Sequence, residues 1–232
     1  MPSVTSAVLW PNGKIYFFSG SKYYRYTPNL AVQGPAGSFD SGYPLDIDPP
    51  AGEPRHWDRL TWPIDGAIVW PTPIDEKIKA YFFQGDKVFR YDVASDKVDD
   101  NYPRLTRDEW PGFFPPGSAN SEVSAAVLWP PQLFPPAGPK VYFFQRNQYY
   151  AYDVLTHQGD ANYPRLISVS GGWPGLWSSS PYVKAAMIWP TPINGGIKAF
   201  FFQYDLFAMV DIATRSVDPG YPKRLQGNWP GF

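Results

Sequence analysis

The chain repeats one pattern four times at a nearly constant interval. A short aliphatic stretch opens each copy and reads AVLW, AIVW, AVLW and AMIW. The stretches end at Trp10, Trp70, Trp129 and Trp189, and a proline follows each tryptophan. Self-similarity at a fixed period is the signature of a repeat architecture, and it constrains the fold more strongly than local preferences do.

Each copy then carries the same series of motifs in the same order. A Lys-x-aromatic-Phe-Phe stretch comes first, then a stretch rich in aromatic residues, and then Asp-x-x-Tyr-Pro. Trp-Pro-Gly recurs at Trp110, Trp173 and Trp229, with Trp57 as an irregular counterpart in the first copy. The three motifs lie at 14–18, 22–26 and 40–44, at 79–83, 87–91 and 99–103, at 140–144, 148–152 and 160–164, and at 198–202, 206–210 and 218–222.

Each copy reads as four short strands. The aliphatic stretch and the two aromatic stretches form the first three, and a weaker fourth strand precedes Asp-x-x-Tyr-Pro. Tight turns separate the second and third strands, because Gly, Asn and Asp tolerate positive φ. These turns are Gly20-Ser21, Gly85-Asp86, Arg146-Asn147 and Tyr204-Asp205.

Four-stranded units repeated around an axis predict an all-β, four-bladed β-propeller with pseudo-fourfold symmetry. A linear solenoid is disfavoured because neither terminal copy has a polar capping face. Two sandwich domains would not produce four equal repeats. We expect one domain over residues 1–232, with blades at approximately 1–61, 62–120, 121–180 and 181–232.

Composition excludes several classes of function. The chain has 20 basic and 21 acidic residues without a run of either sign, so no electropositive surface for nucleic acid is predicted. No stretch is long and apolar enough for a membrane helix, and the N-terminus lacks the pattern of a secretory signal. The chain has no cysteine, which excludes disulfides and fits an intracellular compartment.

The order of the motifs resembles the hemopexin-like repeat. That family includes blood hemopexin, the C-terminal domains of matrix metalloproteinases, vitronectin and cysteine-free seed albumins of legumes, so its members share a fold and differ in function. The second copy, with KAYFFQGDKVFRYDV at 79–93 and NYPRL at 101–105, is the most similar to it.

The chain also departs from that pattern. Many family members link the first and fourth blades by a disulfide, whereas this chain must close its ring by packing 7–10 against 186–232. The fourth copy lacks the Tyr-x-Arg-Tyr-Asp motif. Proline- and glycine-rich insertions at 28–39, 47–56 and 130–139 are predicted loops, where partner specificity usually resides.

The resemblance implies an ion in the central channel, which is calcium or sodium with chloride deeper inside. Backbone carbonyls two residues before each first-strand alanine would hold the cation, and these residues are Thr5, Asp65, Ser124 and Lys184. Hard cations need several oxygen ligands, and Lys184 opposes a divalent cation unless its ammonium turns to solvent. An anion or water in the channel, or residues that merely begin strands, are the alternatives.

Other recurring residues have a structural interpretation. Asp40, Asp99, Asp160 and Asp218 lie too far apart in a propeller to share one calcium ion, so we expect them to cap Asx turns. Arg25 and Arg90 occupy the same position of the third strand, and we expect them to pack between blades.

The sequence contains no catalytic motif that its residues could complete. His56 and His157 are the only histidines, they fall in different blades, and no nucleophile elbow or nucleotide-binding loop is present. One propeller with two separated histidines also argues against haem.

We therefore expect a non-enzymatic binding module that takes a small ligand, a glycan or a protein at its channel mouth and insertions. Fungal and bacterial single-chain relatives imply lectin-like, defence or insecticidal roles, and seed-albumin relatives imply polyamine or haem ligands. The alternative is a storage or scaffold protein that forms a homodimer, and a further one is haem or polyamine binding.

Overall fold

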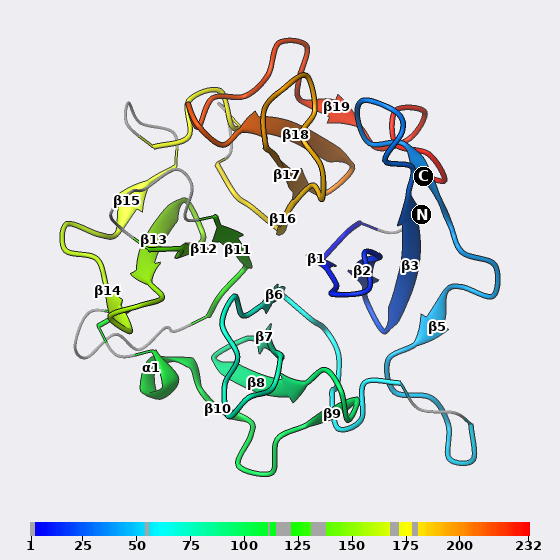
Figure 1. The fold of residues 1–232 in the computed structure, drawn as a ribbon, viewed down its shortest axis with the longest axis vertical. Coiled ribbons are helices and arrows are strands. Elements are labelled where there is room, and N and C mark those ends of the chain that lie inside the picture. The colour runs from blue at the N-terminus through cyan, green and yellow to red at the C-terminus, as the bar shows by residue number, and fades with distance from the viewer. Residues whose placement is uncertain are drawn as a thin grey trace.

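Four antiparallel sheets stand around a common centre like the blades of a propeller (Figure 1). The computed structural model describes residues 3–53, 56–110, 112–114, 122–130, 138–167, 172–177 and 181–232. The predicted all-β, four-bladed architecture is confirmed, and each sheet contains the motifs of one repeat.

The first two blades each contain five strands. The innermost strand lies nearest the centre, and the third strand pairs with two short outer strands. Blade 1 contains β1 (Ser6–Leu9), β2 (Ile15–Ser19), β3 (Lys22–Pro28), β4 (Gly37–Phe39) and β5 (Leu45–Asp46). Blade 2 contains β6 (Gly66–Val69), β7 (Lys79–Gln84), β8 (Lys87–Asp92), β9 (Lys97–Val98) and β10 (Arg104–Leu105).

Blade 3 follows the same plan, whereas blade 4 has four strands with a single outer strand. The short helix α1 (Thr106–Glu109) follows blade 2 in the chain. Blade 3 contains β11 (Ala125–Trp129), β12 (Lys140–Gln145), β13 (Gln148–Asp153), β14 (Gln158–Gly159) and β15 (Arg165–Leu166), and blade 4 contains β16 (Ala185–Ile188), β17 (Lys198–Gln203), β18 (Leu206–Asp211) and β19 (Lys223–Arg224).

The outermost strand is longer than the sequence indicated. In blades 1 to 3 it consists of two short segments that pair with the same third strand, one on each side of the Asp-x-x-Tyr-Pro turn. The Tyr-Pro peptide bond is cis in all four blades. The insertion at 28–39 also differs from the predicted loop, because β4 pairs with β3 and Phe39 packs on Phe17 and Tyr26. Most of the insertion at 130–139 lies outside the described residues.

The tight turns between second and third strands are confirmed as two-residue connections. Their flanking residues pair directly, as in Ser19 with Lys22 and Gln84 with Lys87. The first residue of each turn has positive φ, and these residues are Gly20, Gly85, Arg146 and Tyr204.

Tryptophans fill the spaces between blades. Trp110 contacts Tyr81 of blade 2 and Phe143 and Tyr152 of blade 3, with ring centroids 5.0–5.2 Å apart. Trp57 has the same place between blades 1 and 2, which confirms it as the irregular counterpart. Trp173 packs in the same way between blades 3 and 4, and Trp229 between blades 4 and 1.

Side-chain packing closes the ring, as the sequence predicted. Trp229 contacts Phe17 of blade 1 and Phe200 of blade 4 at 5.7 and 5.1 Å, and Phe232 packs on Phe17 and Phe39. Within the described residues each sheet contains strands of a single repeat, so no strand is exchanged between the first and last blades. The two termini lie beside each other where these blades meet (Figure 1).

Candidate functional site

The innermost strands of the four blades surround the central channel. β1, β6, β11 and β16 each end a sheet, and each lies next to the innermost strands of both neighbouring blades. The Trp10 amide donates to the Lys14 carbonyl at 2.8 Å, and the equivalent Trp70 and Trp189 amides donate to the carbonyls of Lys79 and Lys198. Because paired and unpaired residues alternate in an antiparallel ladder, the backbone groups of the alternate residues, such as Ala7 and Leu9, point away from the sheet and toward the channel.

The predicted cation residues occupy equivalent positions at one mouth of this channel. Each immediately precedes an innermost strand, and its amide donates to a phenylalanine carbonyl of the second strand. The N···O distances are 2.8 Å from Thr5 to Phe18, 2.9 Å from Asp65 to Phe83, 2.8 Å from Ser124 to Phe144, and 2.9 Å from Lys184 to Phe202. Fourfold equivalence at this mouth is therefore a property of the structure.

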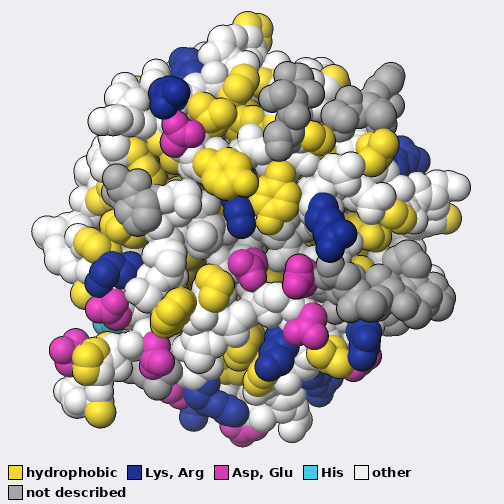
Figure 2. All heavy atoms as spheres, turned by 180° about the vertical axis from the view of Figure 1, so that it is seen from behind, with side chains coloured by type: hydrophobic (Ala, Val, Ile, Leu, Met, Phe, Trp, Pro, Cys, Tyr) yellow, Lys and Arg dark blue, Asp and Glu magenta, His cyan; other side chains and the backbone are white. Residues whose placement is uncertain are grey.

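The side chains of these residues have other partners. The hydroxyl groups of Thr5 and Ser124 donate to the Phe18 and Phe144 carbonyls. Asp65 Oδ2 accepts a hydrogen bond of 2.8 Å from the Gly85 amide in the β7–β8 turn. Lys184 Nζ lies over the Tyr182 ring, 5.0 Å from its centroid. On the face drawn in Figure 2, acidic and basic side chains lie close together around the centre beside hydrophobic ones.

Asp65 and Glu122 are acidic residues at this mouth. Burial raises the pKa of the Asp65 carboxyl, the Gly85 amide and the positive charge of Lys184 oppose this rise, and Glu122 adds to it. In the described part of the chain no ion pair joins Asp65 to Lys184, although the charge of Lys184 acts on the Asp65 carboxyl. A small cavity of about 220 Å³ lies between Asp65, Ser124 and Tyr182.

The backbone of this mouth fits a cation better than its side chains do. None of the hydrogen bonds made by described residues ends on the carbonyl oxygen of Thr5, Asp65, Ser124 or Lys184. Four equivalent carbonyls without a donor are suitable ligands for a hard cation. Among the residues that the structure describes, no cluster of three or more His, Asp or Glu side chains provides another such site.

The opposite mouth is apolar. Here the innermost strands end, and a cavity of about 510 Å³ opens between them. Leu9, Val69, Leu128 and Ile188 line it at equivalent positions, and each is only half-buried. The motif analysis assigned these residues to strands but did not foresee that their ends would enclose a cavity.

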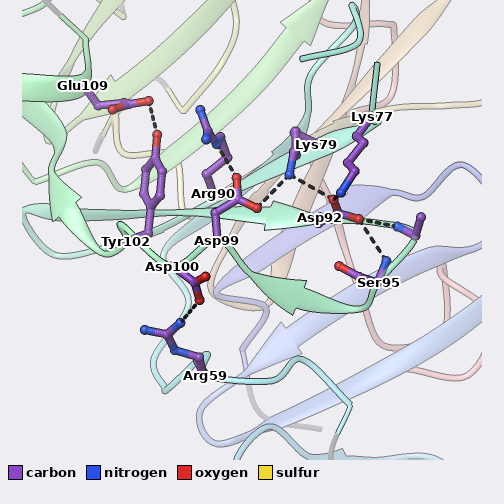
Figure 3. A network of polar contacts seen from close by, with 11 residues as sticks. Arg59, Lys77, Lys79, Arg90, Asp92, Ser95, Asp99, Asp100, Tyr102 and Glu109 are labelled. Atoms are coloured by element: carbon purple, nitrogen blue, oxygen red, sulfur yellow. Dashed lines mark hydrogen bonds and ion pairs between the residues drawn. The ribbon is translucent and has the colours of Figure 1, made fainter. Parts of the chain in front are cut away.

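The recurring aspartates make ion pairs, which corrects the predicted Asx caps. Lys79 Nζ lies 2.7 Å from Asp99 and 3.0 Å from Asp92, and Arg90 Nε lies 2.5 Å from Asp99 (Figure 3). Burial alone would raise the pKa of Asp99, but hydrogen bonds from Lys79 and Arg90 outweigh it and lower that pKa. The Asx turn is formed instead by Asp92, which accepts from the Ala94 and Ser95 amides.

The same triad of one lysine and two aspartates recurs in other blades. Blade 3 uses Lys140 with Asp153 and Asp160, and blade 4 uses Lys198 with Asp211 and Asp218. In blade 1, Thr27 replaces one aspartate, accepting a hydrogen bond from Lys14 and donating one to Asp40. These triads tie the second and third strands to the turn of each blade, so they are structural.

The two arginines of the third strand also stay within their own blades. Arg25 pairs with Asp40 and lies over Tyr43, and Arg90 lies over Tyr102. The prediction that Arg25 and Arg90 pack between blades is therefore wrong, because their guanidinium groups contact residues of their own blades.

The two histidines lie apart on the surface. His56 and His157 are both exposed, and His157 stacks on Trp70 at 6.1 Å. The structure does not bring them together into a shared site.

One exposed aromatic side chain was missed by the motif analysis. Trp62 is 54% exposed and lies between the first two blades in the chain, beside Thr61 and Pro63. Gln84 at the end of β7 accepts a hydrogen bond of 2.9 Å from Thr61 and donates one of 3.2 Å to the Pro63 carbonyl. Trp62 and Trp177 are the two tryptophans outside every repeated motif, and of these Trp177 is buried whereas Trp62 is exposed.

Comparisons with known proteins agree with the fold. A human protein, matrix metalloproteinase-20, is 30% identical over 131 residues, which cover 56% of this chain and 22% of that protein. The chain thus spans about a quarter or less of the curated relatives it matches first. A plant albumin from Cicer arietinum showing hemagglutination has a TM-score of 0.72 at 18% identity, covering 97% of this chain and 95% of that one.

A second solved structure is equally similar. A plant lectin with two metal-binding sites, also from Cicer arietinum, has a TM-score of 0.70 at 20% identity, with 97% of this chain and 95% of that chain covered. No helix in the described residues is long and apolar enough to cross a membrane. The sequence pattern named Hemopexin matches residues 4–48, 64–114 and 137–178, which is more than half of the chain. The chain therefore belongs to the hemopexin family.

Proposed function

We propose that this propeller is a non-enzymatic binding module that recognises a carbohydrate through Trp62. The exposed indole of Trp62 carries the proposal, because a large apolar side chain in water is available for a ligand. No described aromatic residue stacks on its ring. A sugar presents apolar C–H groups on one ring face and hydroxyl groups at its edge.

The surroundings of Trp62 suit such a ligand. Thr61 and Pro63 flank Trp62 in the chain, and their hydrogen bonds with Gln84 fix the amide of that side chain. Hydrogen bonds to both Pro63 and Thr61 attach this segment to the rigid β7–β8 hairpin, so the indole is held by the scaffold. Names of structural relatives that mention hemagglutination and lectin support this choice of ligand.

A glycan array tests the proposal directly. We expect the labelled protein to bind a defined group of glycans, and Trp62→Ala to weaken the strongest of these at least tenfold in a titration. Leu155→Ala is a matched control, because Leu155 is 61% exposed but belongs to blade 3. An array without bound glycan would favour the storage or scaffold alternative. Equal affinity of Trp62→Ala and the parent would also contradict the proposal.

We further propose that the four backbone carbonyls of Thr5, Asp65, Ser124 and Lys184 hold a calcium or sodium ion. Their freedom from hydrogen bonds with described residues supports this assignment. The bound ion would supply positive charge at the channel axis, and the ring of residues would only position it.

A further inference from the structure

The second mouth of the channel has the size of a ligand site. Its cavity of about 510 Å³ falls within the range of roughly 300–1,000 Å³ in which proteins bind small molecules. All four innermost strands contribute to its wall, beginning at Ala7, Ala67, Ala126 and Ala186. A site built on the four central strands rests on regular secondary structure, which positions side chains more precisely than loops do.

The lining of this cavity is almost entirely apolar. Among the described residues that line it, only Thr72 and Trp70 have a polar side-chain group, and none is charged. Prolines that follow the first-strand tryptophans form part of the rim, together with Ile78, which is 47% exposed. Water in such a cavity finds few hydrogen-bond partners on the side chains, so an apolar molecule that displaces it gains free energy.

The channel axis nevertheless provides a few polar groups. The alternate backbone groups of the innermost strands, such as those of Ala7 and Ala67, point toward the channel rather than toward the second strand. A hydroxyl or carbonyl group of a ligand can reach these amides and carbonyls. An ionised group would lose its hydration without finding an opposite charge, so its binding is disfavoured.

We propose that this apolar mouth binds a neutral hydrophobic small molecule that carries one hydroxyl or carbonyl group. The polar group points down the channel axis, and the hydrocarbon lies between Leu9, Val69, Leu128 and Ile188. A terpenoid alcohol or a medium-chain fatty alcohol has this chemistry. The site does not depend on the carbohydrate surface at Trp62, which involves different residues.

A neutral fluorescent probe, N-phenyl-1-naphthylamine, measures binding to the folded chain. We expect saturable binding of one probe per chain, and displacement of the probe by 1-decanol. Decanoate and decylammonium have a chain of the same length with a charge, and we expect each to displace the probe at least tenfold less effectively. Equal displacement by all three compounds would overturn the proposed selectivity for a neutral ligand.

Two aspartate substitutions in the same blade locate the site. Leu128→Asp places a charge at the cavity wall and should weaken probe binding at least tenfold. Leu166→Asp places the same charge at a residue that is 41% exposed in β15 and outside the cavity, and should leave binding unchanged. If Leu128→Asp does not fold, judged by its thermal transition, Val69→Asp takes its place.

The outcomes separate this site from the carbohydrate surface. Trp62→Ala should keep full probe binding, whereas Leu128→Asp should keep glycan binding. Absence of saturable probe binding in the parent would overturn the proposal, as would equal losses in Leu128→Asp and Leu166→Asp.

Discussion

The first residue of the turn between second and third strands differs among the four blades, although its backbone conformation does not. The first position of the two-residue turn has positive φ in every blade, at 57° in Gly20, 56° in Gly85, 54° in Arg146 and 53° in Tyr204. A Cβ added to Gly20 or Gly85 would meet no atom within 4 Å, so only backbone strain opposes a side chain there. Valine at either glycine should lower the free energy of unfolding by about 1 kcal/mol or more. Arg146→Gly and Tyr204→Gly should raise it by about 0.5–1 kcal/mol, and urea denaturation measures all four changes. Unchanged stability in both glycine variants would contradict the argument from φ.

The lysine–aspartate triads are the polar element that each blade repeats, and they predict how stability depends on pH. Burial opposes ionisation of Asp99, but Lys79 and Arg90 lower its pKa in the folded state. The unfolded chain therefore takes up this proton first, and stability should fall as pH drops from about 5 toward 2. Asp99→Asn should make that fall less steep in urea titrations. Asp100→Asn is the matched control, because Asp100 is 96% exposed in its pair with Arg59 and solvent screens that pair. Equal slopes for Asp99→Asn and the parent would show that the triad does not control acid stability.

At the scale of the strands, most of the fold could be predicted from the sequence, but the complete ion-pair triads and the apolar cavity could not. The repeated letters located the inner three strands of every blade, because hydrophobic strand patterns are local. One ion pair of the triads could have been predicted from the sequence, because the two-residue turn at Gly85-Asp86 sets Lys79 opposite Asp92. The role of Asp99 depended on how the outer strand folds back on both sides of the Tyr-Pro turn, and no local pattern describes that. The apolar cavity could not be predicted, because it arises from the radius at which four strands meet.

The whole molecule decides whether the channel holds a cation, because only the closed ring brings the four carbonyls around one axis. Lys184 Nζ lies near Tyr182, and its charge acts on Asp65. The Lys184 ammonium repels a cation in the channel, whereas the carboxylate of Lys184→Asp would attract it. The substitution should therefore tighten calcium binding. A ligand that binds only the folded state stabilises it by about 2.7 kcal/mol at a hundredfold excess over its Kd. We therefore expect calcium to raise the Tm of Lys184→Asp more than that of the parent, and Asp65→Lys to remove any response. Lys223→Asp is the control, since Lys223 lies over Tyr221 in the outer strand of blade 4 and has the same charge change. If the parent and Lys184→Asp were both indifferent to calcium and to sodium, the channel would be a geometric consequence of fourfold packing, without a role in cation binding.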